Sequence, residues 1–353
     1  MKGKDHHYIG IDVGSVSINT IILSETKEII EEEYTRTKGQ PLEKVKGLLA
    51  NILDRYPAES IKGISTTGSG GKLLAKLLGG NFTNEVISQT KAVEIFYPQV
   101  KTIIEMGGED SKLIFMQQDK TSGNVKIEDF SMNSVCAAGT GSFLDQQASR
   151  LGFTIEEFGR TAMKSEKPPR IAGRCSVFAK SDMIHLQQIA TPDYDIVAGL
   201  CFAVARNFKS TMAKGKKFLP PVSFQGGVAA NGGVRRAFKE VLEFGDDQFI
   251  VPEHYASMGA VGAALIAIEK DNAIWSGEID TLEEYISTGI KKDEYKGLES
   301  LRTPKSHPCY NKSIPKPYPA GERTKVFLGI DVGSVSTNLV LIDRKKQLIT
   351  KRY

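Results

Sequence analysis

The chain has 353 residues, 40% of them hydrophobic and 25% charged, and this length predicts about two domains because one core rarely exceeds about 300 residues. Its 46 basic and 42 acidic residues leave a net charge of +4, and no basic tract interleaved with aromatics favours nucleic-acid binding. No apolar run of about 18 residues and no apolar leader occur, so we expect a cytoplasmic protein without a membrane partner.

The N-terminal part begins with a predicted β-meander. Residues 8–34 are predicted to form three strands, joined first by a Gly/Ser turn and then by a polar tip. Apolar residues at helical spacing predict a helix over 41–56, and a strand at 61–69 follows it. A helix is expected at 70–80 and a strand at 85–89. Such a mixture of strands and helices is typical of an α/β domain.

A second unit of strand, glycine turn and strand is predicted over residues 100–119, about 90 residues after the first. Both units place an acidic residue and glycine at the turn, and two such turns can line one cleft. The elements expected afterwards are helices at 139–163, 175–190, 193–215, 233–244 and 257–271, and a strand at 221–227.

The sequence changes character after residue 271. Residues 304–319 contain five prolines and no apolar period, which predicts an extended linker. The octapeptide GIDVGSVS of residues 10–17 then recurs at 329–336, and its flanking residues align without gaps. An internal duplication explains this repeat.

Three regions follow from the pattern: a first module over residues 1–270, an extension and proline-rich linker over 271–325, and the truncated start of a second module over 326–353. The chain stops at Tyr353, the counterpart of Tyr34, so we expect a piece of a longer protein with tandem modules. The second copy lacks the later glycine turns and cannot form a complete site by itself.

The first glycine turn has the residues that a nucleotide phosphate requires. Glycine lets backbone N–H groups approach phosphate oxygens, and the hydroxyls of Ser15 and Ser17 beside Gly14 add donors. Asp12, at the end of the strand, can hold Mg²⁺ through water. A single Asp-x-Gly-Ser turn also occurs in ordinary β-turns, so the later turns decide between the two interpretations.

Two later glycine turns follow in a characteristic order. The second consists of Glu105, Gly107, Gly108 and Glu109, and the third of Gly226, Gly227 and Asn231. This order resembles that of actin, hexokinase and the heat-shock chaperones, whose α/β ATPase fold duplicates a ribonuclease H-like domain around a nucleotide cleft. The resemblance implies that the first two turns bracket the phosphates and that the third lies against the adenosine. It also implies two lobes, roughly residues 1–95 with the helix near 256–270, and residues 96–255.

Two cysteines lie in motifs that precede helices. Cys136 stands before a Gly-Thr-Gly turn and a helix, and Cys175 stands at the start of another helix. The helix dipole there favours a thiolate, or an anionic cluster bound to it. An iron-sulfur cluster usually takes about four thiolates, which a two-fold dimer would supply. Buried structural thiols and a zinc site stay open at this point, although no histidine stands at ligand spacing.

The combined motifs resemble one family. The segments GIDVGSVS, EMGGEDSK, CAAGTGSFLD, GRCSVFAKSD, GGVAANGGV and GAVGAALIA look like those of the BadF/BadG/BcrA/BcrD-type activator ATPases of 2-hydroxyacyl-CoA dehydratases and benzoyl-CoA reductases. The resemblance covers residues 8–270. It implies a homodimer, or a pair of tandem modules, that hydrolyses ATP and passes a low-potential electron from a shared 4Fe-4S cluster to a dehydratase or reductase. Ferredoxin or flavodoxin is the implied electron donor.

The resemblance also implies roles for single residues. Cys136 and Cys175 are implied as cluster ligands. The implied catalytic acids are Asp12, Glu105 and Glu109, with Asp12 holding Mg²⁺ through water. The implied contacts to ATP or ADP come from Gly14, Ser15, Ser17, Gly107, Gly108, Gly226, Gly227 and Asn231. The family commonly has Asp and Gln where this chain has Glu105 and Glu109, which changes the expected arrangement of Mg²⁺ and attacking water.

Two other functions fit the same fold. A sugar or carboxylate kinase would use Glu105 or Glu109 as its base, and an ATP-gated assembly protein would hydrolyse little ATP. The remaining cysteines and one histidine are expected to be structural, with Cys201 in the core, Cys309 exposed in the linker and His185 an ordinary surface or packing residue.

Overall fold

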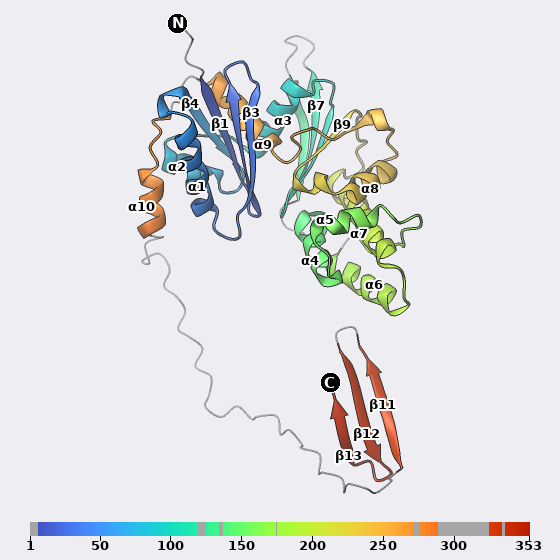
Figure 1. Cartoon of the computed structure of the whole chain (residues 1–353). Coiled ribbons are helices and arrows are strands. Elements are labelled where there is room, and N and C mark those ends of the chain that lie inside the picture. Colours follow the sequence, from blue (N-terminus) through green and yellow to red (C-terminus); the bar gives the residue numbers. More distant parts are fainter. Residues whose placement is uncertain are drawn as a thin grey trace. The chain divides into compact units, whose positions relative to one another are not determined.

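The computed structural model describes residues 6–118, 125–133, 137–173, 175–270, 275–288, 325–333 and 336–353 (Figure 1). The chain divides into two compact units, residues 1–291 and residues 292–353. Each unit has sheets of its own and is described separately. None of the helices in the described ranges is long and apolar enough to cross a membrane.

The first sheet of the larger unit begins with the predicted meander. Its strands are β1 (His7–Val13), β2 (Ser17–Ser24), β3 (Ile29–Arg36), β4 (Ile61–Thr67) and β5 (Asn81–Phe82). They lie in the order β3-β2-β1-β4-β5. β1 pairs antiparallel with β2 across the glycine turn and parallel with β4. The parallel step requires a crossover, which contains α1 (Pro41–Arg55).

The second sheet repeats this topology. Its strands are β6 (Thr102–Met106), β7 (Ser111–Gln118), β8 (Val125–Asn133), β9 (Val222–Gln225) and β10 (Phe249–Ile250). Their order, β8-β7-β6-β9-β10, matches the first sheet strand for strand. β8 was not predicted from the sequence. The duplicated sheets confirm the predicted actin/hexokinase-like α/β ATPase fold.

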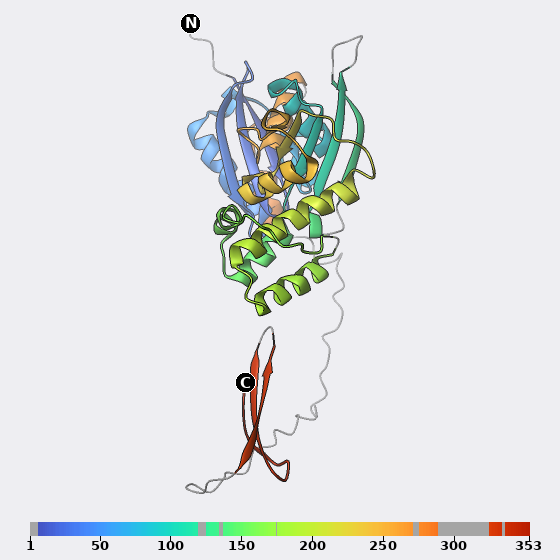
Figure 2. The ribbon, with the colours of Figure 1, turned by 90° about the vertical axis from the view of Figure 1, so that its right-hand side faces the viewer.

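Helices accompany both sheets. Those packed with the first sheet are α1, α2 (Gly71–Leu78), α3 (Glu85–Phe96), α9 (Met258–Glu269) and α10 (Asp280–Thr288). Those of the second lobe are α4 (Gly141–Leu151), α5 (Ile155–Ala162), α6 (Ser176–Gln188), α7 (Asp193–Met212) and α8 (Gly232–Leu242) (Figure 2). Short 3-10 helices are η1 (Ala58–Ser60), η2 (Ala137–Gly139), η3 (Gly227–Ala230) and η4 (Asp246–Gln248).

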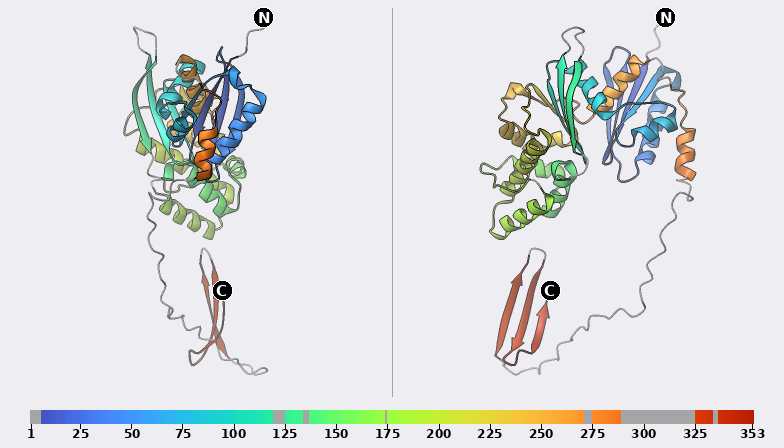
Figure 3. Two further views of the ribbon diagram at one scale, coloured as in Figure 1. Left: turned by 90° about the vertical axis from the view of Figure 1, so that its left-hand side faces the viewer. Right: turned by 180° about the vertical axis from the view of Figure 1, so that it is seen from behind.

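α3 and α9 lie between the two sheets (Figures 1 and 3). They share a hydrophobic cluster with Ile21 of β2 and Ile114 of β7. Glycines allow α9 to approach its neighbours closely. A methyl group at Gly10 of β1 would overlap the carbonyl of Ala260 in α9, and a methyl group at Gly262 of α9 would overlap the carbonyl of Ser88 in α3. The small-residue helix expected near residues 257–271 therefore joins the two lobes.

The strand predicted at residues 85–89 is wrong, because these residues form the first turns of α3. The side chain of Asn84 caps the helix by accepting a hydrogen bond from the N–H of Val86 at 2.9 Å. The helix is buried on several sides, so its apolar residues do not form the single stripe that predicts a helix.

The single helix predicted over residues 139–163 is two helices, α4 and α5. Gly152 ends α4 in the left-handed conformation, with a φ of +77°. Thr154 then starts α5 with a capping box, in which its hydroxyl accepts from the N–H of Glu157 at 3.2 Å. The change of direction between α4 and α5 is therefore encoded in these local residues.

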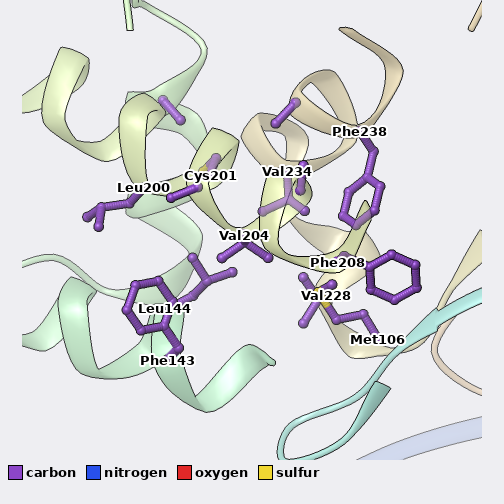
Figure 4. Close-up of a cluster of buried hydrophobic side chains, with 14 of the residues drawn as sticks. Met106, Phe143, Leu144, Leu200, Cys201, Val204, Phe208, Val228, Val234 and Phe238 are labelled. Carbon is purple, nitrogen blue, oxygen red and sulfur yellow. The ribbon is translucent and has the colours of Figure 1, made fainter. Parts of the chain in front are cut away.

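The core of the second lobe lies between its helices and its sheet. Figure 4 shows Cys201, Val204 and Phe208 of α7 beside Val234 and Phe238 of α8. The rings of Phe208 and Phe238 meet edge to face, with centroids 5.4 Å apart. Burial raises the pKa of the Cys201 thiol to about 12, so this thiol is unreactive. The prediction that Cys201 belongs to the core is confirmed.

The smaller unit contains a three-stranded sheet made of β11 (Val326–Val332), β12 (Thr337–Asp343) and β13 (Leu348–Arg352). β11 and β12 pair in the same register as β1 and β2. The N–H of Gly333 donates to the carbonyl of Ser336 at 2.9 Å, as the N–H of Gly14 does to the carbonyl of Ser17 at 2.9 Å. The repeated octapeptide therefore begins the same hairpin twice.

Candidate functional site

A cavity of about 970 Å³ opens between the two lobes of the larger unit, where the two glycine turns meet. Eleven residues predicted from the sequence line it: Asp12, Gly14, Ser15, Ser17, Glu105, Gly107, Gly108, Glu109, Gly226, Gly227 and Asn231. The structure thus brings together all of the acids, hydroxyls and glycines that were expected to contact a nucleotide or Mg²⁺.

Hydrogen bonds shape the first turn, at the end of β1. The N–H of Gly14 donates to the carbonyl of Ser17 at 2.9 Å. The buried Thr37 donates from its hydroxyl to the carbonyl of Ser15 at 2.7 Å. These bonds occupy carbonyl oxygens, so the turn is left to present donors to an anionic ligand.

Asp12 is half-buried at the floor of the cavity. Two glycines make room for it, because a methyl group at Gly68 or Gly259 would overlap its carboxylate oxygens. Removal from bulk water, and then the carboxylate of Glu85, raise the pKa of Asp12 to about 7, although the ammonium of Lys112 acts in the opposite direction. A carboxylate with so little compensation fits a divalent cation, which would restore its ionised form.

The second turn is bonded directly to α4. The carbonyl of Gly107 accepts from the N–H of Gly141 at 2.9 Å, and the carbonyl of Gly108 accepts from the N–H of Ser142 at 2.7 Å. These two donors are the first residues of α4, whose N–H groups have no partner within the helix. The second turn and the start of α4 are therefore joined directly by two hydrogen bonds.

A third bond joins the same turn to the segment after Cys136. The hydroxyl of Ser111, at the start of β7, donates to the carbonyl of Gly139 in η2 at 2.8 Å. Gly139 stands three residues after Cys136 in the sequence. The turn expected to hold phosphate and the segment expected to hold a cluster ligand are therefore mechanically connected.

Lys112 of β7 is a functional candidate that the sequence reasoning missed. Its ammonium lies 2.7 Å from Glu85, 2.8 Å from Asp110 and 3.0 Å from Glu105, and its side chain is 4% exposed. Burial lowers the pKa of Lys112, but the three carboxylates more than offset this effect and raise it. The lysine is therefore a fixed positive charge at the cavity floor.

Glu105 shares this lysine and is 6% exposed. Burial raises the pKa of Glu105 to about 7, against the lowering effect of Lys112. A carboxyl group that titrates near neutral pH can take up and release a proton under working conditions. Glu109 lines the same cavity from the second turn.

The third turn offers a buried donor. Gly226 has a φ of +89°, which favours glycine. The side-chain oxygen of Asn231 caps α8 by accepting from the N–H of Val234 at 3.1 Å. Its side-chain nitrogen is buried and makes no hydrogen bond to any residue that the structure describes. A buried donor in a cavity wall fits a bound ligand atom.

Of the two motif cysteines, Cys136 lies outside the described residues. Cys175 is the half-buried N-cap of α6, is in no disulfide and makes no capping bond. A half-buried cysteine that is in no disulfide and makes no capping bond fits a metal ligand. In the described part of the chain, no group of three or more His, Cys, Asp or Glu side chains can hold a metal ion.

Neither His185 nor Asp182 lines the cavity. His185 is exposed on α6, so of the surface and packing roles left open for it the structure shows the surface one. Cys309 lies outside the described residues. Asp182 of α6 has a structural role, since its carboxylate accepts from the N–H of Ala172 at 2.8 Å.

Known proteins of related sequence share most of the larger unit. Residues 9–267 match the BadF/BadG/BcrA/BcrD ATPase family. The chain is 33% identical to the 2-hydroxyisocaproyl-CoA dehydratase activator of Clostridioides difficile, over 74% of this chain and 95% of that protein.

Two solved structures agree with this match. Component A of the (R)-2-hydroxyglutaryl-CoA dehydratase of Acidaminococcus fermentans has a TM-score of 0.67 and 31% identity, covering 75% of this chain and 99% of that one. The activator of the 2-hydroxyisocaproyl-CoA dehydratase of Clostridium difficile, with bound ADPNP, has a TM-score of 0.64 and 29% identity, covering 83% and 100%. The resemblance read from the motifs is confirmed, and the chain belongs to the BadF/BadG/BcrA/BcrD ATPase family.

Proposed function

We propose that the chain is an ATP-hydrolysing reductive activator. It passes a low-potential electron from a 4Fe-4S cluster, shared between two modules, to a 2-hydroxyacyl-CoA dehydratase or a similar reductase. The observation that carries the proposal is the hydrogen bonding of the second glycine turn to the segment after Cys136. Relatives that are dehydratase activators, one of them with bound ADPNP, support it. Ferredoxin or flavodoxin is the proposed donor.

In this proposal the cavity binds ATP and Mg²⁺ and converts ATP and water to ADP and phosphate. The first two glycine turns hold the phosphates through backbone N–H groups, and Asp12 holds Mg²⁺ through water. Positioning and charge stabilisation dominate such reactions. Glu105, with a pKa of about 7, is suited to orient the attacking water and take up its proton, with Glu109 beside it.

The same contacts couple the nucleotide to the cysteines. A change in the phosphates at Gly107 and Gly108 shifts their carbonyls, which are bonded to the first residues of α4. The bond between Ser111 and Gly139 carries the shift toward Cys136. A conformational switch usually rests on a segment that can pack in two discrete arrangements, and we propose that the segment after Cys136 does so.

Cys136 and Cys175 are the proposed cluster ligands. When bound, a 4Fe-4S cluster supplies a one-electron carrier whose potential depends on its hydrogen bonds and solvent exposure. Each chain offers two thiolates, so we assign the other two to a second copy. Val177 and Phe178, which follow Cys175 on α6, support this assignment, because they are 64% and 65% exposed. Large exposed apolar residues beside a ligand favour an interface.

We expect Phe178→Asp to dissociate the proposed dimer, because the interface would then have to bury an unpaired carboxylate. The dissociation constant should rise at least about 100-fold, as for an aromatic residue at an interface centre. Anaerobic sedimentation velocity measures the change. Ile189→Asp is the matched control, since Ile189 is 60% exposed at the other end of α6. A Phe178→Asp protein that stays dimeric would exclude the start of α6 from the interface.

Anaerobically purified protein is expected to contain about four irons per two chains. Cys136→Ser and Cys175→Ser should each reduce the iron content to near zero. Cys201→Ala is the control and should keep its iron, because Cys201 is fully buried in the core. Retention of iron by either serine variant would show the cluster assignment to be wrong. Iron-free protein whose ATP turnover requires an added hydroxyl compound would favour a kinase instead.

We also propose that residues 326–353 are the first strands of a second module of the same kind, joined by the segment 271–325 to a first module over residues 1–270. The common register and the common turn bond of the two hairpins support this proposal. A second module could supply the other pair of thiolates within one polypeptide.

A further inference from the structure

Asn207 is a buried polar residue on α7. It lies between two segments, residues 137–140, which follow Cys136, and residues 171–173, which precede Cys175. These are called the two cysteine segments. Its neighbours along the helix, among them Val204 and Phe208, belong to the hydrophobic core, and Asn207 itself is 2% exposed. A buried carboxamide is costly unless its oxygen and its nitrogen both find partners. The hydrogen-bond partners of Asn207 therefore show which parts of the chain this side chain joins.

The carboxamide of Asn207 bonds to the backbone of both segments. Its nitrogen donates to the carbonyl of Gly173 at 3.2 Å, and its oxygen accepts from the N–H of Gly139 at 3.3 Å. The reverse orientation would place donor against donor and acceptor against acceptor, so the hydrogen bonds determine this one. Gly139 stands three residues after Cys136, and Gly173 stands two residues before Cys175.

Both glycines permit a close approach to α7. A methyl group at Gly173 would lie 2.5 Å from the carbonyl oxygen of Ala203, which is closer than real side chains come. A methyl group at Gly139 would lie 3.2 Å from the carboxamide of Asn207. The two segments thus reach one polar side chain because neither carries a side chain at the contact.

Other hydrogen bonds hold each segment singly. The carbonyl of Ile171 accepts from Arg206 at 3.0 Å, and the N–H of Ala172 donates to Asp182 at 2.8 Å. On the other side, the bond from Ser111 ties Gly139 to the second glycine turn. Asn207 differs from these residues because it joins the two segments to each other.

We propose that Asn207 is a positioning residue that sets the separation of the two cysteine segments within one chain. The inference rests on the proposed function for the role of the thiols. Metal ligands must be held at fixed separations by groups that are themselves hydrogen-bonded. Since Gly139 is also connected to the phosphate turn, Asn207 further transmits to the Cys175 segment any movement that the nucleotide causes at the Cys136 segment.

Hydrogen-deuterium exchange of the cluster-free chain tests the connection. The variants are Asn207→Leu and Asn207→Asp, and the probes are peptides spanning residues 137–143 and 169–176. Asn207→Leu should accelerate exchange in both peptides, by about tenfold for the Gly139 amide, because it removes both bonds. Asn207→Asp should accelerate exchange only in the second peptide, because a carboxylate still accepts from Gly139 but repels the carbonyl of Gly173.

Ser210→Ala is the matched control on α7, because the hydroxyl of Ser210 donates at 3.0 Å to the backbone carbonyl of Asn207 and to neither segment. Unchanged exchange over residues 137–143 in Asn207→Leu would overturn the connection.

Iron binding tests the positioning role separately. After anaerobic reconstitution with iron and sulfide, Asn207→Leu should lose iron on desalting and show an altered electron paramagnetic resonance spectrum. Full iron retention with an unaltered spectrum would overturn the positioning role. Wild-type protein that takes up no iron would overturn the proposed function, and the exchange data alone would then decide whether Asn207 joins the segments.

Discussion

Replacing Asp12 with asparagine is expected to stabilise the nucleotide-free protein at pH 8 and to remove most of its ATP hydrolysis. The pKa of Asp12 is raised from 3.8 to about 7, first by removal from water and then by Glu85. Between these pH values the folded chain binds a proton that the unfolded chain has released, so the free energy of unfolding falls as the pH rises. At pH 8 the folded state carries a poorly compensated charge, which asparagine does not have.

Melting temperatures at pH 8 and pH 5 check this expectation. Asp12→Asn should melt above the wild type at pH 8, and the difference should shrink at pH 5, where the folded wild type has already taken up its proton. Asp54→Asn makes the same chemical change at an exposed position on α1 and should alter neither value. An Asp12→Asn protein that melts below the wild type at pH 8 would contradict the expectation.

The activity of the same variant should fall by about 100-fold or more, as expected for loss of a preorganised charge at the reacting phosphates. Its iron content should not change, since Asp12 lines the cavity at the end of β1 and is not a proposed cluster ligand. Loss of iron together with activity would point to a wider disturbance of the fold. When a protein holds a functional group in an unfavourable environment, replacing that group is expected to raise stability and to lower activity.

The part of the site that could be predicted from the sequence is the part that local residues encode. Asp12 and Glu105 lie at or near the ends of equivalent strands, β1 and β6, and glycine follows each of them. Gly14 and Gly107 each donate a hydrogen bond to the residue three positions later. Because the two sheets share one topology, these similar turns meet at one cavity.

The rest of the site depends on contacts between distant segments. Lys112 lies in a strand with a mostly apolar sequence. Its partner Glu85 begins α3, whose residues 85–89 were predicted to be a strand. Asn207 is likewise one of several polar residues of α7, and only the fold brings Gly139 and Gly173 to it. Hydrophobic periodicity does not report such polar contacts.

Lys112→Met is expected to destabilise the protein strongly. It removes the cation shared by three carboxylates and leaves the side chain of Glu105 buried, at 7% exposure, without a counter-ion. Breaking a buried pair in this way costs about 3–5 kcal/mol, which lowers the melting temperature by about 10 °C.

Lys91→Met is the matched control for this substitution. Lys91 also bridges two carboxylates, at 3.1 Å from Glu94 and 2.7 Å from Glu269, but on a more exposed surface. Its replacement should cost less than about 1 kcal/mol. An equal loss of stability in Lys91→Met and Lys112→Met would contradict the expectation that the buried ion pairs of Lys112 stabilise the protein more than the exposed ones of Lys91.

The deficit of Lys112→Met should also depend on pH. The pKa of Glu105 is raised to about 7 by burial, although Lys112 lowers it, so without the lysine it rises further above its ordinary 4.5. Stability is then lost as the pH rises through the folded pKa, which makes the deficit largest at pH 8 and smaller at pH 5. A second substitution, Glu105→Gln, should recover part of the loss at pH 8, because it removes the unpaired charge.

Failure of the double variant to recover stability would assign the loss to packing instead of charge. Recovery would show that Lys112 neutralises Glu105 in the nucleotide-free cavity, together with Glu85 and Asp110. Asp12 forms no ion pair with any residue that the structure describes, and removal from water, followed by the carboxylate of Glu85, raises its pKa to about 7. In the proposed function, Lys112 therefore explains why Mg²⁺ is directed to Asp12, where the ion supplies the missing positive charge.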